Sequence, residues 1–351
     1  MWQGILGHDD VVEQFRRRLA AGRVNGTFLF VGPAGVGKRL FAQKLAQTLL
    51  CQAGSRRELD PCGHCEDCTL MAAGTHPDFL TVAKPADKSE IPLSLLIGPP
   101  ENRMREGLCH EIGMKPFRGG RRIAVIDDAD ELNEEGANAL LKTLEEPPPK
   151  SVLILIGTSA DRQLPTIRSR SQMIRFAPLA AADIETLLVR QGLVDAPKAA
   201  AVAGAAEGSL ERARRLADPE LSALRTELYG QLAAGALNSQ GLAKLLLGFA
   251  EGAGKDAGAR RERLRWSIGF LVEFYRELLR VLSGAPLSAD RPLADAAAKA
   301  GRATTFDAEA VAAAVERALE AIEHVDRNAH YAALVEALCD DLARTLTPVA
   351  V

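Results

Sequence analysis

The chain has 351 residues, 47% of them hydrophobic and 25% charged, with a formal net charge of −3. This is the composition of a folded protein long enough for two or three domains, and it excludes a strongly basic protein that coats nucleic acid. The first ten residues, MWQGILGHDD, form neither a basic nor an apolar leader, and apolar runs such as 152–156 are too short to span a membrane. We therefore expect a cytoplasmic protein.

Short apolar runs alternate with helical patterns in the first half of the chain. Five runs predict β-strands: Thr27–Val31, Phe79–Val82, Arg122–Asp127, Val152–Gly157 and Gln172–Phe176. Because these runs are continuously apolar and separated by helices, they predict an α/β fold with a parallel sheet covered on both faces. The segment 84–102 holds four prolines and predicts a loop before a helix at about 103–112.

The first predicted strand runs into a phosphate-binding loop, Gly32-Pro33-Ala34-Gly35-Val36-Gly37-Lys38, which precedes a helical pattern. In such a GxxxxGK loop the glycines permit a tight turn whose N–H groups face an anion, while the lysine neutralises phosphates. The pattern predicts that Gly32, Gly35, Gly37 and Lys38 can bind ATP or ADP.

Two residues of this nucleotide site are unsuited to hydrolysis. The residue after the lysine usually supplies a hydroxyl to Mg²⁺, but here it is Arg39, a permanent cation that cannot coordinate a metal. The strand 122–127 delivers Asp127 toward magnesium, and Asp128 stands where a glutamate usually orients water. Since misplacing that carboxylate by about 1 Å can cost ~10²-fold in rate, we expect little or no turnover. The alternative is that these acids form a solvated turn.

Four of the six cysteines lie close together, at Cys51, Cys62, Cys65 and Cys68. In a reducing cytosol this spacing favours a metal site over two disulfides, and four thiolates suit a tetrahedral, structural Zn²⁺ with no open position for water. His64 and His76 are alternative ligands in the same module, about residues 51–78. Cys109 and Cys339 are expected to be isolated packing residues.

The second half of the chain predicts helices only. Glycines 192, 204 and 208 divide short helical patterns within 182–216, and further helices follow to about Leu346. Trp266, Phe270 and Phe274 lie four residues apart on one predicted helix, a spacing that indicates packing rather than a ligand site. We expect three domains, at 1–178, 179–240 and 241–351.

Three motifs carry a family resemblance: DDADEL at 127–132, ANALLKTLEEPP at 137–148 and LPTIRSRS at 164–171. Together they resemble bacterial clamp-loader subunits of the AAA+ ATPase family, which place a sliding clamp on DNA. The resemblance implies an AAA+ P-loop sheet, a small helical lid, a C-terminal helical collar and a sensor 1 position at Thr158. It also implies that Arg170 projects into the ATP site of a neighbouring subunit, with Ser171 replacing the family's cysteine.

The resemblance implies partners as well: clamp-loader subunits of the tau or gamma and delta types, the sliding clamp, and primer-template DNA, but no membrane. Gly208-Ser209 precedes Arg212 by one residue too many for the family's sensor 2 arginine, so that role is not assigned. Arg39 and Asp128 favour a subunit of the delta-prime type in a DNA polymerase III assembly, with no polymerase site of its own. The alternatives are an ATP-hydrolysing tau or gamma motor and a zinc-bearing AAA+ interaction module outside replication.

Overall fold

A computed structural model of the chain describes residues 2–55, 58–85, 88–118, 120–234, 237–303 and 307–346. They form two compact units. We call Met1–Leu187 with Glu207–Glu211 the α/β unit, and Leu188–Ala206 with Arg212–Val351 the helical unit. The expected separation of lid and collar near residue 240 stays a prediction.

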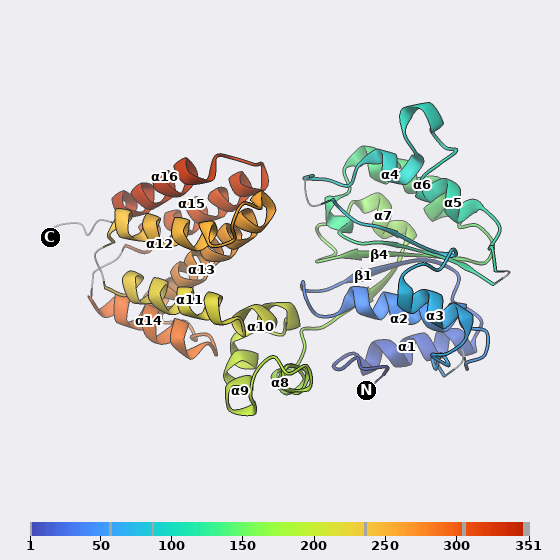
Figure 1. Cartoon of the computed structure of the whole chain (residues 1–351), viewed down its shortest axis with the longest axis horizontal. Helices are drawn as coiled ribbons and strands as arrows, with labels where there is room; N and C mark the ends of the chain where they lie inside the picture. Colours follow the sequence, from blue (N-terminus) through green and yellow to red (C-terminus); the bar gives the residue numbers. More distant parts are fainter. Residues whose placement is uncertain are drawn as a thin grey trace. The chain divides into compact units, whose positions relative to one another are not determined.

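The α/β unit alternates strands with helices in chain order (Figure 1). Its strands are β1 (Gly26–Val31), β2 (Phe79–Val82), β3 (Arg122–Ile126), β4 (Ser151–Gly157) and β5 (Gln172–Arg175). Its helices are α1 (Asp9–Ala20), α2 (Lys38–Leu50), α3 (Glu66–Ala73), α4 (Leu93–Ile97), η1 (Pro100–Asn102), α5 (Leu108–Gly113), η2 (Ala129–Glu131), α6 (Glu134–Glu145) and α7 (Pro165–Arg170), and α8 (Ala181–Arg190) begins in it.

The five strands form one sheet of order β2-β3-β4-β1-β5 in which each pairing is parallel. β1 lies between β4 and β5: Phe28 lies opposite Ile154 of β4, and Phe30 opposite Ile174 of β5. The predicted strands are confirmed, with ends that differ by no more than one residue. The carboxyl ends of parallel strands lie at the same edge of a sheet, so the segments that follow β1, β3 and β4 lie near one another.

Successive side chains of β1 point to opposite faces of the sheet, as in any pleated strand. Phe28 and Phe30 join Phe15 of α1 and Phe41 of α2 in an aromatic cluster with ring centroids 5.3 to 6.0 Å apart. Leu29 and Val31 belong to the opposite core, with buried residues of α4, α5, α6 and α7. Figure 1 shows α1 and α2 on one face and α4 to α6 on the other, which confirms the expected α/β architecture.

The prediction of a plain loop over 84–102 was wrong in its second half. Residues 93–97 form α4 because Leu96 and Ile97 are buried beneath α6, so tertiary packing decides the local structure. The next helix, α5, begins at Leu108 rather than near 103, because Gly107 precedes it with φ +84° and lies tightly against the backbone of Gly98. Ala86 and Asp87 of this segment lie outside the described residues.

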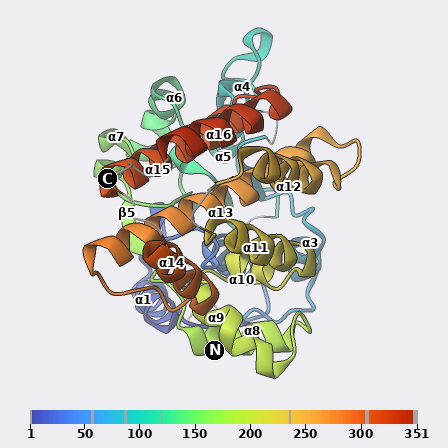
Figure 2. The ribbon, with the colours of Figure 1, turned by 90° about the vertical axis from the view of Figure 1, so that its left-hand side faces the viewer.

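The helical unit begins with the end of α8 and contains α9 (Ala196–Ala205), most of α10 (Leu210–Leu216), α11 (Pro219–Leu232), α12 (Ser239–Glu251), α13 (Ala257–Ser283), α14 (Arg291–Ala303), α15 (Ala308–Asp326) and α16 (Tyr331–Thr345). The long helix α13 packs against α11, α12, α14 and α15 (Figure 2). Phe270 and Phe274 are buried, and the guanidinium of Arg215 stacks 3.3 Å from the ring centroid of Trp266. The packing interpretation of these aromatic residues is confirmed.

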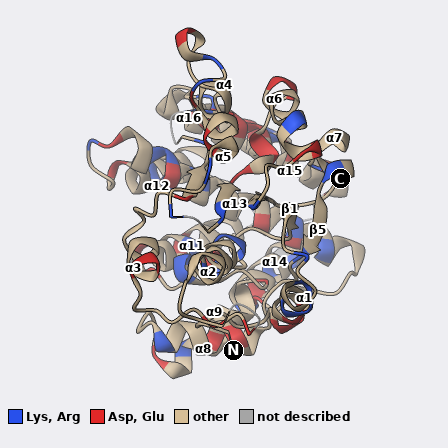
Figure 3. Ribbon diagram, turned by 90° about the vertical axis from the view of Figure 1, so that its right-hand side faces the viewer, with Lys and Arg blue, Asp and Glu red and all other residues tan. Residues whose placement is uncertain are grey.

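Charges of both signs are interspersed along the ribbon in Figure 3, in agreement with the small net charge. Among the described residues, no helix combines the length and the apolar character needed to cross a membrane.

Candidate functional site

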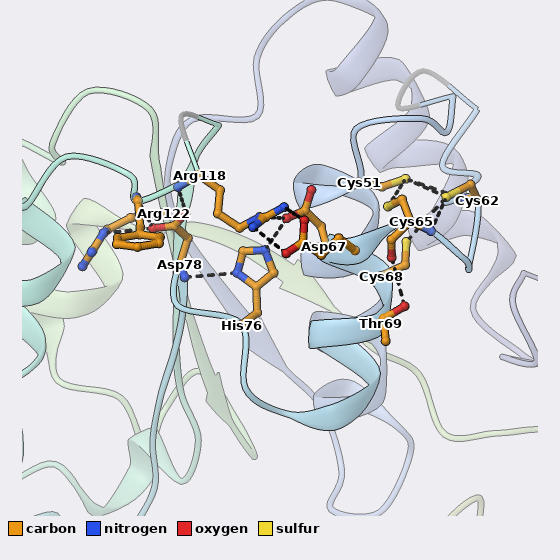
Figure 4. A network of polar contacts seen from close by, with 12 residues as sticks. Cys51, Cys62, Cys65, Asp67, Cys68, Thr69, His76, Asp78, Arg118 and Arg122 are labelled. Carbon is orange, nitrogen blue, oxygen red and sulfur yellow. Dashed lines mark hydrogen bonds and ion pairs between the residues drawn. The ribbon is translucent and has the colours of Figure 1, made fainter.

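The four clustered cysteines meet where α2 ends and α3 begins (Figure 4). The Sγ of Cys51 lies 3.6 Å from that of Cys62 and 3.8 Å from that of Cys65, and all four sulfurs fall within 4.8 Å of one another. Thiolates at 2.3 Å from a tetrahedral zinc stand about 3.8 Å apart, whereas a disulfide needs about 2.05 Å. The geometry therefore fits one metal ion rather than two disulfides.

Backbone N–H groups already favour thiolates in this cluster. Cys51 Sγ accepts from the N–H of Gly54 at 3.2 Å and of Cys62 at 3.4 Å. Burial pushes the pKa of the Cys65 thiol upward, but hydrogen bonds from Cys68, Gln52 and neighbouring thiols outweigh it and lower the pKa to about 6. Burial raises the pKa of Cys68 to about 12, and the adjoining sulfurs contribute. Four sulfurs this close cannot all ionise without a cation among them.

The two histidines proposed as alternative ligands contact other groups. His64 Nδ1 lies 2.8 Å from the carbonyl oxygen of Cys62, and His76 Nε2 lies 3.2 Å from Asp67 Oδ1. His76 is buried, and its Nδ1 accepts from the N–H of Asp78. The four cysteines are thus the complete candidate ligand set in this module, as far as the structure describes it.

A buried polar network joins the cysteine module to the chain before β3 (Figure 4). The Asp78 carboxylate is fully buried and accepts from the N–H groups of Phe117 at 2.7 Å and Arg118 at 2.9 Å. The Arg118 side chain binds both Asp67 and Glu66 at the start of α3. Nothing in the sequence connects these residues, because the network joins segments about 40 residues apart.

The phosphate-binding loop connects β1 to α2, as predicted, and its lysine binds the loop itself. Lys38 Nζ donates to the carbonyl oxygens of Gly32 and Pro33, both at 2.6 Å, and the side chain is 7% exposed. Burial lowers the pKa of Lys38, although Asp130 and Asp127 oppose the shift. The lysine charge is therefore balanced within the chain.

The acid expected to hold magnesium lies beside the arginine that replaces the usual hydroxyl. Arg39 Nη1 stands 3.3 Å from Asp127 Oδ2, with 63% of the arginine and 19% of the aspartate side chain exposed. Burial and the charge of Asp128 raise the pKa of Asp127, whereas Arg39 lowers it. Asp128 follows with a left-handed backbone, φ +54°, and its N–H donates to Asp127. The structure thus brings Lys38, Arg39, Asp127 and Asp128 to the carboxyl ends of β1 and β3.

Residues 207–211, which follow the last strand and α9 in the sequence, cover the phosphate-binding loop within the α/β unit. The N–H of Leu210 donates to the carbonyl oxygen of Gly35 at 3.0 Å. A Cβ on Gly35 would lie 2.3 Å from Ser209 Oγ, so glycine is needed there for this contact. The next residue, Arg212, belongs to the helical unit, where it pairs with Glu273 at 2.5 Å.

The expected sensor 1 residue, Thr158, lies at the end of β4 and binds an acid of the DDADEL motif. Its N–H and hydroxyl donate to Asp130 Oδ2 at 2.8 and 2.6 Å, and Gln163 donates to the other oxygen. Asp130 therefore joins η2 to β4 and to the loop before α7. In the sequence Asp130 was noted only as part of the DDADEL motif, and Gln163 was missed, since only the fold brings these two residues together.

Arg170 is the last residue of α7, and its guanidinium is held beside the last residue of α6. Its Nε and Nη2 both bind Glu145 Oε1 at 2.6 Å. Its Nη1 donates to the carbonyl oxygen of Thr166 at 3.2 Å and to Ser169 Oγ at 3.1 Å. These contacts order the Arg170 side chain, and 32% of its surface remains exposed to solvent.

Comparison with known proteins agrees with these motifs. The family described as "DNA polymerase III, delta subunit" matches residues 7–180. The delta-prime subunit of Pseudomonas aeruginosa is 40% identical over 161 residues, and that of Escherichia coli is 35% identical over 158 residues. Through this region the chain belongs with the delta-prime type of DNA polymerase III clamp-loader subunits.

The stretch that matches the family, residues 7–180, falls within the α/β unit. The matches to the two delta-prime relatives cover 46% and 45% of this chain, and 46% and 44% of the two relatives, so the aligned region spans about half their length. The tau subunit of Escherichia coli is 31% identical over 62% of this chain and 32% of its own length. The matched region holds the phosphate-binding loop, the cysteine cluster and, within residues 7–180, Arg170.

Proposed function

We propose that this chain is a delta-prime-type subunit of a DNA polymerase III clamp loader that helps to place a sliding clamp on primed DNA. In this proposal Arg170 acts in trans on ATP bound by a neighbouring subunit of the tau or gamma type. A guanidinium in that position stabilises the charge that develops on the transferred phosphoryl group. The observation that carries the proposal is the ordered, partly exposed guanidinium of Arg170 at the end of α7.

The chain's own nucleotide site also supports a function in which ATP is hydrolysed at the neighbouring subunit rather than here. Lys38 is bound by its own loop, and Asp127 is paired with Arg39, so two groups that hydrolysis requires are engaged by residues of the chain. We propose that this site binds ATP or ADP through Gly32, Gly35, Gly37 and Lys38, with Thr158 nearby and without efficient use of Mg²⁺. A delta-type subunit, the clamp and primer-template DNA are the other proposed partners.

We also propose that Cys51, Cys62, Cys65 and Cys68 bind Zn²⁺ in a structural role. Four sulfur ligands match the softness and tetrahedral preference of zinc and leave no position for a reacting water. The ion would hold together a loop that has few apolar side chains of its own. Residues 179–240 are proposed as the lid, and residues 241–351 as the helical collar through which subunits associate.

A second candidate is an ATP-hydrolysing motor of the tau kind, which the longer match to the Escherichia coli tau subunit favours. The two candidates differ in what the isolated chain does with ATP. Turnover that disappears in Lys38→Ala would support the motor, whereas turnover equal to that of Lys38→Ala supports the delta-prime function.

The trans role is tested with Arg170→Ala in a complex reconstituted with its partner subunits. We expect normal assembly and a lower clamp-loading rate, because a finger arginine contributes roughly 10³-fold or more at the site it serves. Other sites would keep their own arginines, so the loss in total ATPase is expected to be partial. Arg168→Ala is the matched control, since Arg168 lies on the same helix and pairs only loosely with Asp161 at 3.9 Å. Equal behaviour of the two variants would exclude the trans role.

A further inference from the structure

The end of α6 holds a carboxylate that the proposed function does not yet use. Glu145 is the last residue of α6, and the prolines that follow at 147–149 prevent the helix from continuing. The backbone that carries Glu145 is therefore fixed where α6 packs against α7 (Figures 1 and 2). This is the LEEPP part of the motif at 137–148.

Glu145 binds one edge of the Arg170 guanidinium. A single carboxylate oxygen accepts from Nε and from Nη2, while Nη1 binds the carbonyl of Thr166 and the hydroxyl of Ser169. All three nitrogens of the planar group are thus engaged by the chain itself. The C-terminal end of α6 also favours a cation, because the helix dipole is negative there.

We propose that Glu145 is a positioning residue that orders Arg170 for action on the neighbour's nucleotide, an inference that rests on the proposed function. A free arginine loses much rotamer freedom when it binds a phosphate, so a partner that orders it beforehand makes that step easier. Glu145 acts through Arg170 and needs no contact with nucleotide.

Glu145 could in principle play the opposite role and hold Arg170 away from the neighbour's nucleotide. The solvent exposure of the Glu145 side chain argues against that role. Half of the Glu145 side chain is exposed, and ion pairs that water reaches this well are weak. A nucleotide phosphate carries more negative charge than one carboxylate and competes for the guanidinium effectively. The contact is therefore strong enough to orient Arg170 and too weak to retain it.

The test compares Glu145→Ala, Glu145→Gln and Glu146→Ala in the reconstituted complex. Glu146→Ala removes the same charge one residue away, and in the described part of the chain no side-chain partner of Glu146 is found. We expect Glu145→Ala to lower the ATP turnover number at the site served by Arg170 about tenfold, less than the ~10²-fold that a 1 Å misplacement can cost. The KM for ATP, the melting temperature and assembly should be unchanged. Glu145→Gln should restore most of the rate, since its amide oxygen still accepts from Nε, and Glu146→Ala should match the parent.

Two further variants separate this inference from the proposed function. If Glu145 acts only through Arg170, Glu145→Ala combined with Arg170→Ala should be no slower than Arg170→Ala alone. Turnover by Glu145→Ala equal to or faster than that of the parent, with Arg170→Ala impaired, would overturn the positioning role and leave the trans role intact. If Arg170→Ala itself had no effect, both would fail.

Discussion

The cysteine cluster and the phosphate-binding loop are both polar sites in the α/β unit, but they differ in how their charge is balanced. In the loop, Lys38 is bound by two backbone carbonyls and Asp127 by Arg39. In the cluster, four sulfurs lie within 4.8 Å of one another and accept hydrogen bonds from backbone N–H groups and from neighbouring thiols. The charges of the loop are balanced by groups of the same chain, whereas the four sulfurs of the cluster can ionise together only around a cation.

This difference shows how dependence on a ligand can be inferred from internal contacts. A site whose charges are paired internally keeps its shape whether or not a ligand binds, so its stability should depend little on nucleotide. A site with unbalanced like charges is stable only with a counter-ion, so metal binding and folding are coupled. Three experiments can break or sharpen this contrast.

The largest effect is expected from removing the metal. We predict that Cys68→Ser, or chelation of the parent protein, lowers the free energy of unfolding of the module by on the order of 4 kcal/mol or more, because loss of a structural metal is among the most damaging changes. Metal analysis and hydrogen exchange over residues 58–78 would measure it. Cys109→Ser is the control, because Cys109 lies on α5 outside the cluster. Full protection of the module in metal-free protein would contradict the prediction.

A smaller effect is expected from Arg39→Thr. This change removes the ion pair with Asp127 and supplies the hydroxyl that magnesium usually binds. We predict about tenfold tighter binding of Mg²⁺–ATP, equivalent to ~1.4 kcal/mol, measured by calorimetry. Affinity for ATP in EDTA should change much less. If Mg²⁺ made no difference to the variant, Arg39 would not be what limits the site.

The smallest effect concerns His8, whose Nε2 lies 2.7 Å from the carbonyl oxygen of Val36 in the phosphate-binding loop. Burial lowers the pKa of His8, although its bond to Val36 and the charges of Asp183 and Asp9 oppose the shift. The unfolded state therefore binds more protons below pH ~6.5, so this contribution to stability is present above that pH and is lost as pH falls. We predict that the free energy of unfolding, measured with urea, falls less steeply from pH 7 to pH 5 in His8→Gln than in the parent protein. The two slopes should differ by less than ~1.4 kcal/mol per pH unit. Identical slopes would mean that His8 does not titrate in this range.

The sequence predicted those features that depend on residues close together in the chain. The strands were found because Phe28 to Val31 or Val152 to Ile156 are continuous apolar runs, and the cysteine cluster was found from spacing alone. The packing of Phe270 and Phe274 also followed from helical periodicity.

Contacts between distant segments were not predictable in the same way. Asp130 binds Thr158, Glu145 binds Arg170, and Asp78 binds the backbone of Phe117 and Arg118, and each pair depends on how strands and helices are ordered in space. The short helix α4 was missed for a related reason: burial of Leu96 and Ile97 under α6 outweighs a proline-rich local sequence.

The position of β1 in the sheet has a consequence for how the protein forms during translation. β1 ends at Val31, but its two neighbours, β4 and β5, are made only after about 120 and 140 further residues. β1 therefore emerges from the ribosome long before either of the strands that pair with it, and domains in general fold as units once their chain is complete. The cysteine cluster, by contrast, is complete at residue 68. We expect the nascent chain to acquire its metal first and to close its sheet only after Arg175 has emerged.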